Sequence, residues 1–388
     1  MRIRKISQSA LVAVVACVAL HAQTKPRARD LGVPFDGTPG PLNAITDVAG
    51  VEVGHTTLIS GEGPLVVGKG PVRTGVTAIH PRGKRANDPV FAGWFALNGN
   101  GEMTGTTWVE ESGLMEGPLM ITNTHSVGIV RDAVIAWQVE HSLMHQSFSL
   151  PVVAETFDGG LNDVNGFHVK REHAFAALEN AASGPVAEGN VGGGTGMRCY
   201  QFKGGIGTSS RKLTADQGGY TVGALVQANF GRRDQLTIAG APVGKELPCE
   251  KYGPCGSRPP PSREGSIIIA VATDAPLAAH QLKRLARRAS LGVARTGSTS
   301  GNSSGDIFIA FSTGNPGVAG PEKKANLEIL LNSQLDPVFE ATVQATEEAI
   351  VNALVAAETM VGINGTTAVR LPHNELREVL RKYGRLLE

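Results

Sequence analysis

Short apolar runs broken by glycine and proline alternate along the chain with longer stretches of helical periodicity. Residues 51–59, 63–68 and 74–79 ("VEVGHTTLI", "GPLVVG" and "TGVTAI") predict strands joined by tight turns. Residues 117–144 predict a strand, a turn near Ser126 and then an amphipathic helix. This mixture of strand pairs and helix pairs predicts helices packed outside stacked sheets, an α/β layered class.

The second half of the chain repeats this pattern. Residues 218–231 predict a strand that ends in a loop at Asn229, and residues 266–276 ("SIIIAVATDAP") predict another. Asp274 is the expected N-cap of a helix, with Pro276 near its first position. The sequence "DIFIAF" predicts a further strand, and residues 337–360 and 372–387 predict the last two helices.

One segment interrupts the pattern and divides the chain. Residues 246–265 ("ELPCEKYGPCGSRPPPSREG") are rich in proline, glycine and charge, which no strand or helix interior tolerates. We expect an exposed linker here, of the sort at which chains are cut. Ser266 follows this linker directly, as the first residue of a predicted strand.

Composition narrows the class of protein. The chain has 388 residues, of which 41% are hydrophobic and 18% charged, as in a globular protein of one or two domains. The formal net charge of +1 gives no reason to expect a nucleic-acid partner.

At the N-terminus, Arg2, Arg4 and Lys5 precede an apolar run and then small residues, which predicts a signal peptide over residues 1–22. We therefore expect a periplasmic or secreted protein that has no membrane segment after signal removal.

Neither a metal site nor a nucleotide site is predicted. The four cysteines include Cys249 and Cys255, which could form a disulfide in an oxidising compartment, and Cys199, which would be left unpaired. No cysteine or histidine spacing matches zinc, and "HVKREH" (168–173) has one residue too many for a metalloprotease motif. The run "GNVGGGTG" (189–196) lacks the Lys-Ser/Thr ending of a phosphate-binding loop, so we expect a flexible loop there.

A cluster of small polar residues precedes the "DIFIAF" strand. In "STSGNSSGDIFIAF" (298–311), Ser303, Ser304 and Asp306 gather on a loop of glycines. From the residues alone, a loop whose hydroxyls bond their own backbone is the more common arrangement. The alternative is a nucleophilic site that uses these hydroxyls and the carboxylate.

Six motifs decide between these interpretations. "GPVRTGVTAI", "NGNGEMTG", "ETFDGGLNDVNGFHV", "GALVQANFG", "GSIIIAVATDAPL" and "GNSSGDIFIAFSTGN" occur in this order over roughly residues 30–365. Together they resemble the self-processing serine aminopeptidases, which include L-aminopeptidase D-amidase/D-esterases and β-peptidyl aminopeptidases. The resemblance implies an αββα sandwich with the layers of Ntn hydrolases but a distinct strand connectivity. It also implies a precursor that cuts itself between Gly265 and Ser266.

The resemblance assigns roles to individual residues. Ser266 would be the nucleophile, and the α-amine that it gains on cleavage has a pKa near working pH, so it can take the hydroxyl proton. Ser304 and Asp306 would bond to that amine and hydroxyl, although some relatives carry Glu at the position of Asp306. Asn229 would donate to the oxyanion.

Two further residues would bind the substrate. By the same resemblance, Glu155 would hold the free amino group, which makes the enzyme an aminopeptidase. Phe157 stands where relatives with D-amidase activity carry Tyr, so the hydroxyl that assists at the oxyanion is missing. This departure counts against D-amidase activity and leaves β-aminopeptidase activity open.

The sequence thus predicts an exported, autoproteolytic serine aminopeptidase that acts on small peptides, amides or esters without a cofactor. A single catalytic domain would comprise an α chain, residues 23–265, and a β chain, residues 266–388, and such heterodimers would form a homo-oligomer. One alternative is a non-catalytic exported binding protein of the same fold. Another is an acyltransferase like ornithine acetyltransferase, against which the serine nucleophile and the signal peptide argue.

Overall fold

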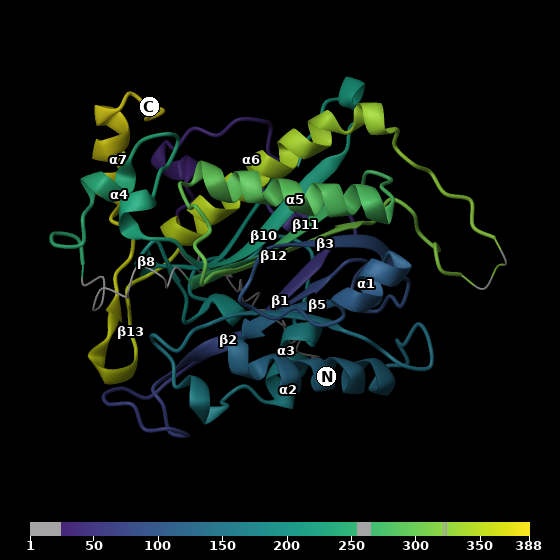
Figure 1. The fold of residues 1–388 in the computed structure, drawn as a ribbon, viewed down its shortest axis with the longest axis horizontal. Helices are drawn as coiled ribbons and strands as arrows, with labels where there is room; N and C mark the ends of the chain where they lie inside the picture. Colours follow the sequence, from purple (N-terminus) through teal and green to yellow (C-terminus); the bar gives the residue numbers. More distant parts are fainter. Residues whose placement is uncertain (1–24, 254–264, 321, 323) are drawn as a thin grey trace, which may run out of the picture.

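Four layers build the protein: a pair of helices, two stacked sheets and a second pair of helices (Figure 1). The structure is a computed structural model, and it describes residues 25–253, 265–320, 322 and 324–388. The predicted signal peptide and Cys255 lie outside the described residues. Within the described part, no helix is long and apolar enough to cross a membrane. The layered arrangement is the predicted αββα sandwich.

The larger sheet has six strands and carries the serine. In spatial order its strands are β4 (Leu114–Met115), β3 (Val90–Gly99), β12 (Gly305–Ser312), β11 (Gly265–Thr273), β10 (Thr221–Phe230) and β9 (Gly205–Lys212). β11 lies at the centre of this sheet, parallel to β12 and antiparallel to β10. The serine-bearing strand is therefore hydrogen-bonded along both edges.

The smaller sheet has four strands. Its spatial order is β1 (Glu52–Ser60), β2 (Val72–His80), β5 (Leu119–Asn123) and β6 (Val152–Thr156). β1, β2 and β5 are antiparallel neighbours, whereas β6 runs parallel to β5. The predicted strand at residues 63–68 is wrong: this segment is a turn whose Val66 forms only an isolated bridge to Gly70.

Apolar cores lie between the layers. On β11, Ile267, Ile269 and Val271 pack under α5 (Ala279–Arg295) and α6 (Asp336–Val355). Their neighbours Ile268, Ala270 and Ala272 pack against the smaller sheet. A strand buried on both faces has no polar face, which explains the unbroken run "SIIIAVA". On the far side, α2 (Val127–Glu140) and α3 (Arg171–Glu179) cover the smaller sheet.

The predicted start of α5 is wrong. The helix begins at Ala279, and Gln281 Oε1 accepts from the Ala278 N–H. Asp274 instead accepts from the Thr221 N–H at 2.7 Å and so joins the end of β11 to β10. Leu282, Leu285 and Ala289 form the apolar face of this helix.

Shorter elements complete the chain. They are α1 (Thr106–Ser112), α4 (Val243–Glu246), α7 (His373–Lys382), and the small hairpins β7 (Arg198–Cys199) with β8 (Phe202–Lys203) and β13 (Met360–Val361) with β14 (Thr367–Ala368). At the start of the predicted linker, α4 ends at Glu246 and Leu247 is buried in the core. Cys249 is disulfide-bonded, and because Cys255 lies outside the described residues, their pairing stays a prediction.

The glycine run at residues 189–196 is not the flexible loop that its composition predicts. Gly192–Gly194 form a buried 3-10 turn between the sheets. A Cβ on Gly193 would lie 2.2 Å from Gln227 Oε1, so a larger residue cannot fit there. The glycines therefore allow close packing next to the end of β10.

Candidate active site

Ser266 is the second residue of β11 and pairs with Asn229 of β10 across the sheet. Its side chain is 7% exposed, and its Oγ accepts from the Gly305 N–H at 3.0 Å. The preceding residue, Gly265, has a φ of +74°. A Cβ there would lie 2.0 Å from the Asn229 carbonyl oxygen, so only glycine fits immediately before the serine.

Ser304 and Asp306 stand at the start of β12, next to the serine. Asp306 is in register with Ile267, the residue after the serine. Ser304 Oγ donates to Asp306 Oδ1 at 2.6 Å, while Oδ2 is buried and has no hydrogen-bond partner in the described part of the chain. Burial raises the pKa of the Asp306 carboxyl above its ordinary value. An acceptor is therefore available beside the start of β11, next to Ser266.

The loop before β12 is held from the neighbouring strand. Asn98 Nδ2 donates to the Ser300 and Gly301 carbonyls, and Asn100 Nδ2 donates to the Ser303 carbonyl at 2.7 Å. The serine-rich loop is thus bonded by Asn98 at the end of β3 and by Asn100 just after that strand, and not only by its own hydroxyls. This fixes the position of Ser304 and of the Gly305 N–H.

Asn229 is oriented by contacts at both ends of its amide. Its Oδ1 accepts from the Arg198 N–H at 2.8 Å, and its Nδ2 donates to the Phe157 carbonyl at 2.9 Å. These bonds use one of the two Nδ2 hydrogens and leave the other available to a further acceptor. Asn229 lies within β10 and not in a loop after it, because the strand continues to Phe230.

Glu155 comes to the site from the other sheet. Its side chain lies on β6 and is 4% exposed. Oε1 accepts from the Glu102 N–H at 3.0 Å, and Oε2 accepts from the Thr124 hydroxyl. A Cβ on Gly101 would lie 3.3 Å from both Glu155 Oε1 and Gly305 Cα, so this carboxylate lies near the residue that holds Ser266 Oγ. Burial raises the pKa of Glu155.

Phe157 stands at the rim of the site with a side chain that is 52% exposed. Its carbonyl, and not its ring, forms the contact with Asn229. Sequence reasoning missed Thr124, which binds Glu155, and Arg198, which orients Asn229 through its main chain. No sequence signal marks either residue, because both contacts join segments far apart in the chain.

The candidate metal-binding and thiol residues of the sequence lie apart from this arrangement. Among the described residues, no group of three His, Cys, Asp or Glu side chains is placed to hold a metal ion. In "HVKREH", His168 Nε2 pairs with Asp163 Oδ2 at 2.8 Å, and His173 Nδ1 accepts from the Lys170 N–H. Cys199 is a free, buried thiol whose pKa burial raises far above its usual range.

The fold and the site together define a serine aminopeptidase with the layers of an Ntn hydrolase. The profile of peptidase family S58 matches residues 43–368, so the chain belongs to this family. It is 57% identical to the β-peptidyl aminopeptidase BapA of Sphingosinicella microcystinivorans, over 97% of each chain. It is 52% identical to the β-peptidyl aminopeptidase BapA of Sphingosinicella xenopeptidilytica, over 95% of this chain and 94% of the relative.

A solved structure agrees with these relatives. The L-aminopeptidase D-Ala-esterase/amidase of Ochrobactrum anthropi superposes with a TM-score of 0.85 at 50% identity. The match covers 93% of this chain and 100% of that one, and that structure is described as a variant of the Ntn hydrolase fold. The predicted family, fold class and enzyme class are confirmed.

Proposed function

We propose that this aminopeptidase is exported, cuts itself between Gly265 and Ser266, and then releases N-terminal residues from short substrates through an ester on Ser266. The observation that carries the proposal is the position of Ser266 at the start of a central strand, with Asn229, Ser304 and Asp306 gathered around it. The α chain would be residues 23–265 and the β chain residues 266–388. Both chains would contribute strands to the same sheet.

Self-cleavage uses the serine against its own preceding bond. Ser266 Oγ attacks the Gly265 carbonyl carbon, and the hydroxyl proton passes to the amide nitrogen as the C–N bond breaks. Water then hydrolyses the resulting ester, which leaves a carboxylate on Gly265 and a free amine on Ser266. The positive φ of Gly265 and the Gly305 N–H on Ser266 Oγ support this step, because they hold the bond and the nucleophile together.

Peptide cleavage then uses the new amine as the base. A free α-amine has a pKa of about 8, so near neutral pH part of it is unprotonated and can take the Ser266 hydroxyl proton. Oγ attacks the substrate carbonyl, and the free Nδ2 hydrogen of Asn229 stabilises the oxyanion. The proton passes to the leaving amine, and water hydrolyses the acyl-serine ester. Asp306 Oδ2 would accept a hydrogen bond from the Ser266 amine.

The substrate class follows from Glu155 and Phe157. A substrate ammonium leaves water on binding, and a buried carboxylate offsets that cost. Phe157 lacks the hydroxyl that would assist at the oxyanion of a D-amino acid amide. Together with relatives named β-peptidyl aminopeptidases, this favours substrates with an N-terminal β-amino acid.

A panel of p-nitroanilides tests the substrate class directly. We expect the purified, cleaved protein to hydrolyse the β-alanyl anilide with a kcat/KM about tenfold or more above those of L-alanyl and D-alanyl anilides. The N-acetyl-β-alanyl anilide should be a poor substrate, because it carries no ammonium for Glu155. A D-alanyl preference, or equal rates on acetylated and free anilides, would contradict the proposal.

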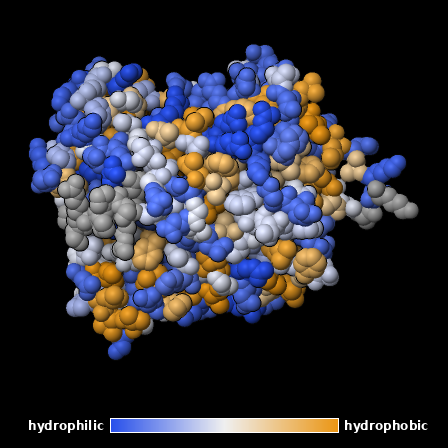
Figure 2. All heavy atoms as spheres, viewed as in Figure 1, coloured by the Kyte–Doolittle hydropathy of each residue, from blue (hydrophilic) through white to orange (hydrophobic). Residues whose placement is uncertain are grey.

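We further propose that the α and β chains stay together and that several such heterodimers form a homo-oligomer. Figure 2 shows apolar side chains gathered at the lower left, where Figure 1 places β13. Val361 of β13 is exposed, and so are Leu65, Val66 and Val67, whose segment reaches the β13–β14 hairpin through the bond from the Leu65 N–H to Asn364 Oδ1. Exposed apolar surface of this kind marks association sites. Sedimentation of the purified protein at the mass of one αβ pair would contradict the oligomer. Retention of the protein in the cytoplasm would contradict export.

A further inference from the structure

Arg198 carries a partly buried guanidinium that the proposed mechanism does not use. The main-chain N–H of this residue orients Asn229, but its side chain has no hydrogen-bond acceptor or carboxylate among the described residues. Burial lowers the pKa of Arg198, and no neighbouring charge offsets this effect. A positive charge is therefore held next to Asn229, and no anion among the described residues balances it.

Other arginines in the protein show that this is unusual. Arg73 donates to the Ser60, Gly61, Val72 and Val361 carbonyls. Arg211 pairs with Glu348 at 2.7 Å, and Arg233 donates to three carbonyls. Each of these buried guanidinium groups is satisfied within the fold, as buried charges generally are. The Arg198 side chain differs from them, because it has no hydrogen-bond or ion-pair partner among the described residues.

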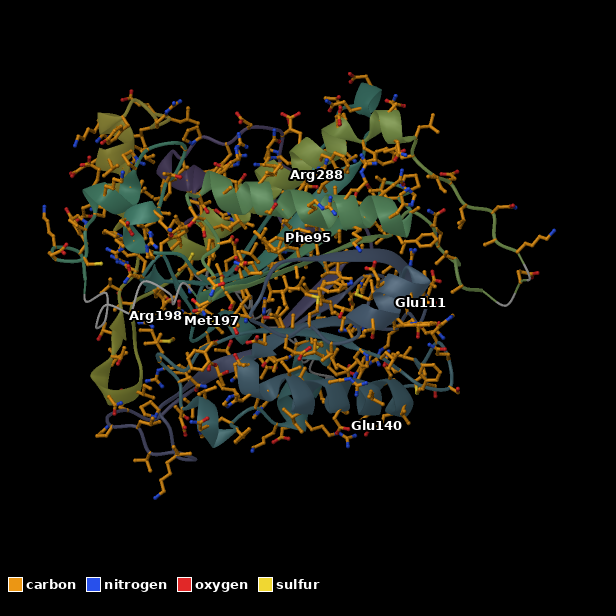
Figure 3. All side chains as sticks on the ribbon, viewed as in Figure 1. Phe95, Glu111, Glu140, Met197, Arg198 and Arg288 are labelled. Carbon is orange, nitrogen blue, oxygen red and sulfur yellow. The ribbon has the colours of Figure 1, made fainter. Side chains whose placement is uncertain are left out.

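The Arg198 guanidinium lies against the loop that follows β6, the strand that carries Glu155. A Cβ on Gly160 would lie 2.7 Å from Arg198 Nη2, and Gly160 is three residues after Phe157. Figure 3 shows Arg198 and Met197 at the end of the sandwich where β8 lies in Figure 1. Asn229 is thus held from two sides. Its Nδ2 donates to the carbonyl of Phe157, two residues after Glu155, and its Oδ1 accepts from the main-chain N–H of Arg198.

A buried lysine lies beside Arg198. Lys203 pairs with Arg198 across the β7–β8 hairpin, is fully buried, and donates to the Gly204 carbonyl at 2.8 Å. Burial lowers the pKa of Lys203 well below its ordinary value, and the charges of Lys25 and Arg198 lower it further. The surroundings of Arg198 therefore supply no negative charge from this side. A carboxylate matches the planar fork of a guanidinium best, since it accepts two parallel hydrogen bonds.

We propose that Arg198 binds the free carboxylate of the leaving residue, so that the enzyme selects dipeptides over longer or blocked substrates. This inference rests on the proposed peptidase function. A dipeptide presents an ammonium at one end and a carboxylate at the other, with the scissile bond between them. Glu155 takes the ammonium, Ser266 and Asn229 act on the carbonyl, and Arg198 takes the carboxylate.

Three substrates that differ only in the leaving group test this assignment. They are β-alanylglycine, its C-terminal amide and β-alanyl p-nitroanilide, of which only the first carries a carboxylate. We expect wild-type enzyme to hydrolyse the dipeptide with a kcat/KM about tenfold above that of its amide, equivalent to about 1.4 kcal/mol. Arg198→Gln should lose about tenfold on the dipeptide and less than about twofold on the amide and the anilide.

Two variants control for charge and for folding. Arg198→Lys keeps the positive charge but not the fork, so it should recover part of the loss on the dipeptide. Arg381→Gln removes an exposed arginine of α7 and should change none of the three rates. Because the contact with Asn229 comes from the main chain of Arg198, Arg198→Gln should still cut itself at Gly265–Ser266, as judged by gel.

The outcomes separate this inference from the proposed function. If cleaved wild-type enzyme hydrolyses the anilide but has the same kcat/KM on the dipeptide and on its amide, Arg198 does not bind the substrate carboxylate. An equal loss by Arg198→Gln on all three substrates, or an uncut Arg198→Gln protein, would also overturn the inference, because the side chain would then serve the fold or the oxyanion. If cleaved wild-type enzyme hydrolyses none of the three, the proposed function itself fails.

Discussion

At the scale of single residues, burial decides how the acids of this site behave. Glu155 and Asp306 both lie in the interior with raised pKa values, and burial is the largest cause for each. Nearby donors offset only part of the effect of burial on each pKa. The Thr124 hydroxyl donates to Glu155, and the Ser304 hydroxyl donates to Asp306. Such carboxylates gain most from a positively charged partner, and a substrate ammonium or the Ser266 amine would provide it.

Glu155→Gln tests the ammonium-binding role. The variant should cut itself normally, because self-cleavage involves no substrate ammonium, but its kcat/KM on β-alanyl anilide should fall about tenfold or more. The comparison variant is Glu110→Gln, which removes an exposed carboxylate that pairs with Lys283. Steady-state kinetics on both proteins measure the effect. A cleaved Glu155→Gln protein with wild-type kinetics would assign the ammonium to another acid.

Asp158 provides a pH-dependent prediction. It is fully buried, accepts from Asn162 Nδ2 at 3.0 Å, and has a pKa that burial raises to about 6. A raised carboxyl pKa stabilises the fold below the unfolded pKa of about 4, and this contribution is lost as the pH rises through about 6.

We therefore expect Asp158→Asn to be more stable than wild type above pH 6 by about 2 kcal/mol, and equal to it near pH 4. The asparagine amide also supplies a donor at the position of Oδ2, which has no partner in the described residues. Thermal unfolding of both proteins across this pH range measures the difference. A constant difference at every pH would show that ionisation of Asp158 is not its cause.

At the scale of elements, the start of β11 positions the bond at which we propose that the chain cuts itself. Gly265 already pairs with Phe230 in the sheet, and its positive φ turns the chain just before the serine. The strand therefore begins one residue before Ser266, and its pairing with β10 holds the proposed scissile bond. This arrangement restricts position 265 to a residue that has no side chain and tolerates a positive φ.

Gly265→Ala should yield a protein that stays uncut or is cut at least about tenfold more slowly. A methyl group there would lie 2.0 Å from the Asn229 carbonyl oxygen, and a positive φ adds about 1 kcal/mol of strain for alanine. Gly240→Ala is the matched control, since Gly240 has a φ of +77° but no atom within 4 Å of the added methyl. A time course on denaturing gels measures both. Equal cutting of the two variants would contradict the role given to Gly265.

Local sequence patterns predicted most of the strands and helices, because period and apolar content report directly on burial. They could not predict the bonds between distant segments. The Asp274 N-cap failed because Thr221, on another strand, takes its carboxylate. The glycine run at 189–196 looked flexible, yet both sheets close over it. Motif resemblance named the candidate site residues, whose roles stay predictions, whereas the contacts of Thr124 and Arg198 required the fold.

At the scale of the whole molecule, the stacking of two sheets assembles the site. The larger sheet brings Ser266, Asn229 and Asp306 together, and the smaller sheet brings Glu155. The sheets meet where Gly101 lies between Glu155 and Gly305. Since β10 and β11 lie on opposite sides of the proposed cut yet pair along their whole length, the α and β chains should stay associated after cleavage.

N-terminal sequencing of the smaller fragment tests the central claim most directly. Purified protein should give two bands on a denaturing gel, and the smaller one should begin Ser-Ile-Ile-Ile, the sequence from Ser266. Ser266→Ala removes the attacking hydroxyl and should remain a single uncut chain without peptidase activity. A smaller fragment that begins at another residue, or a Ser266→Ala protein that is still cut before position 266, would contradict the account.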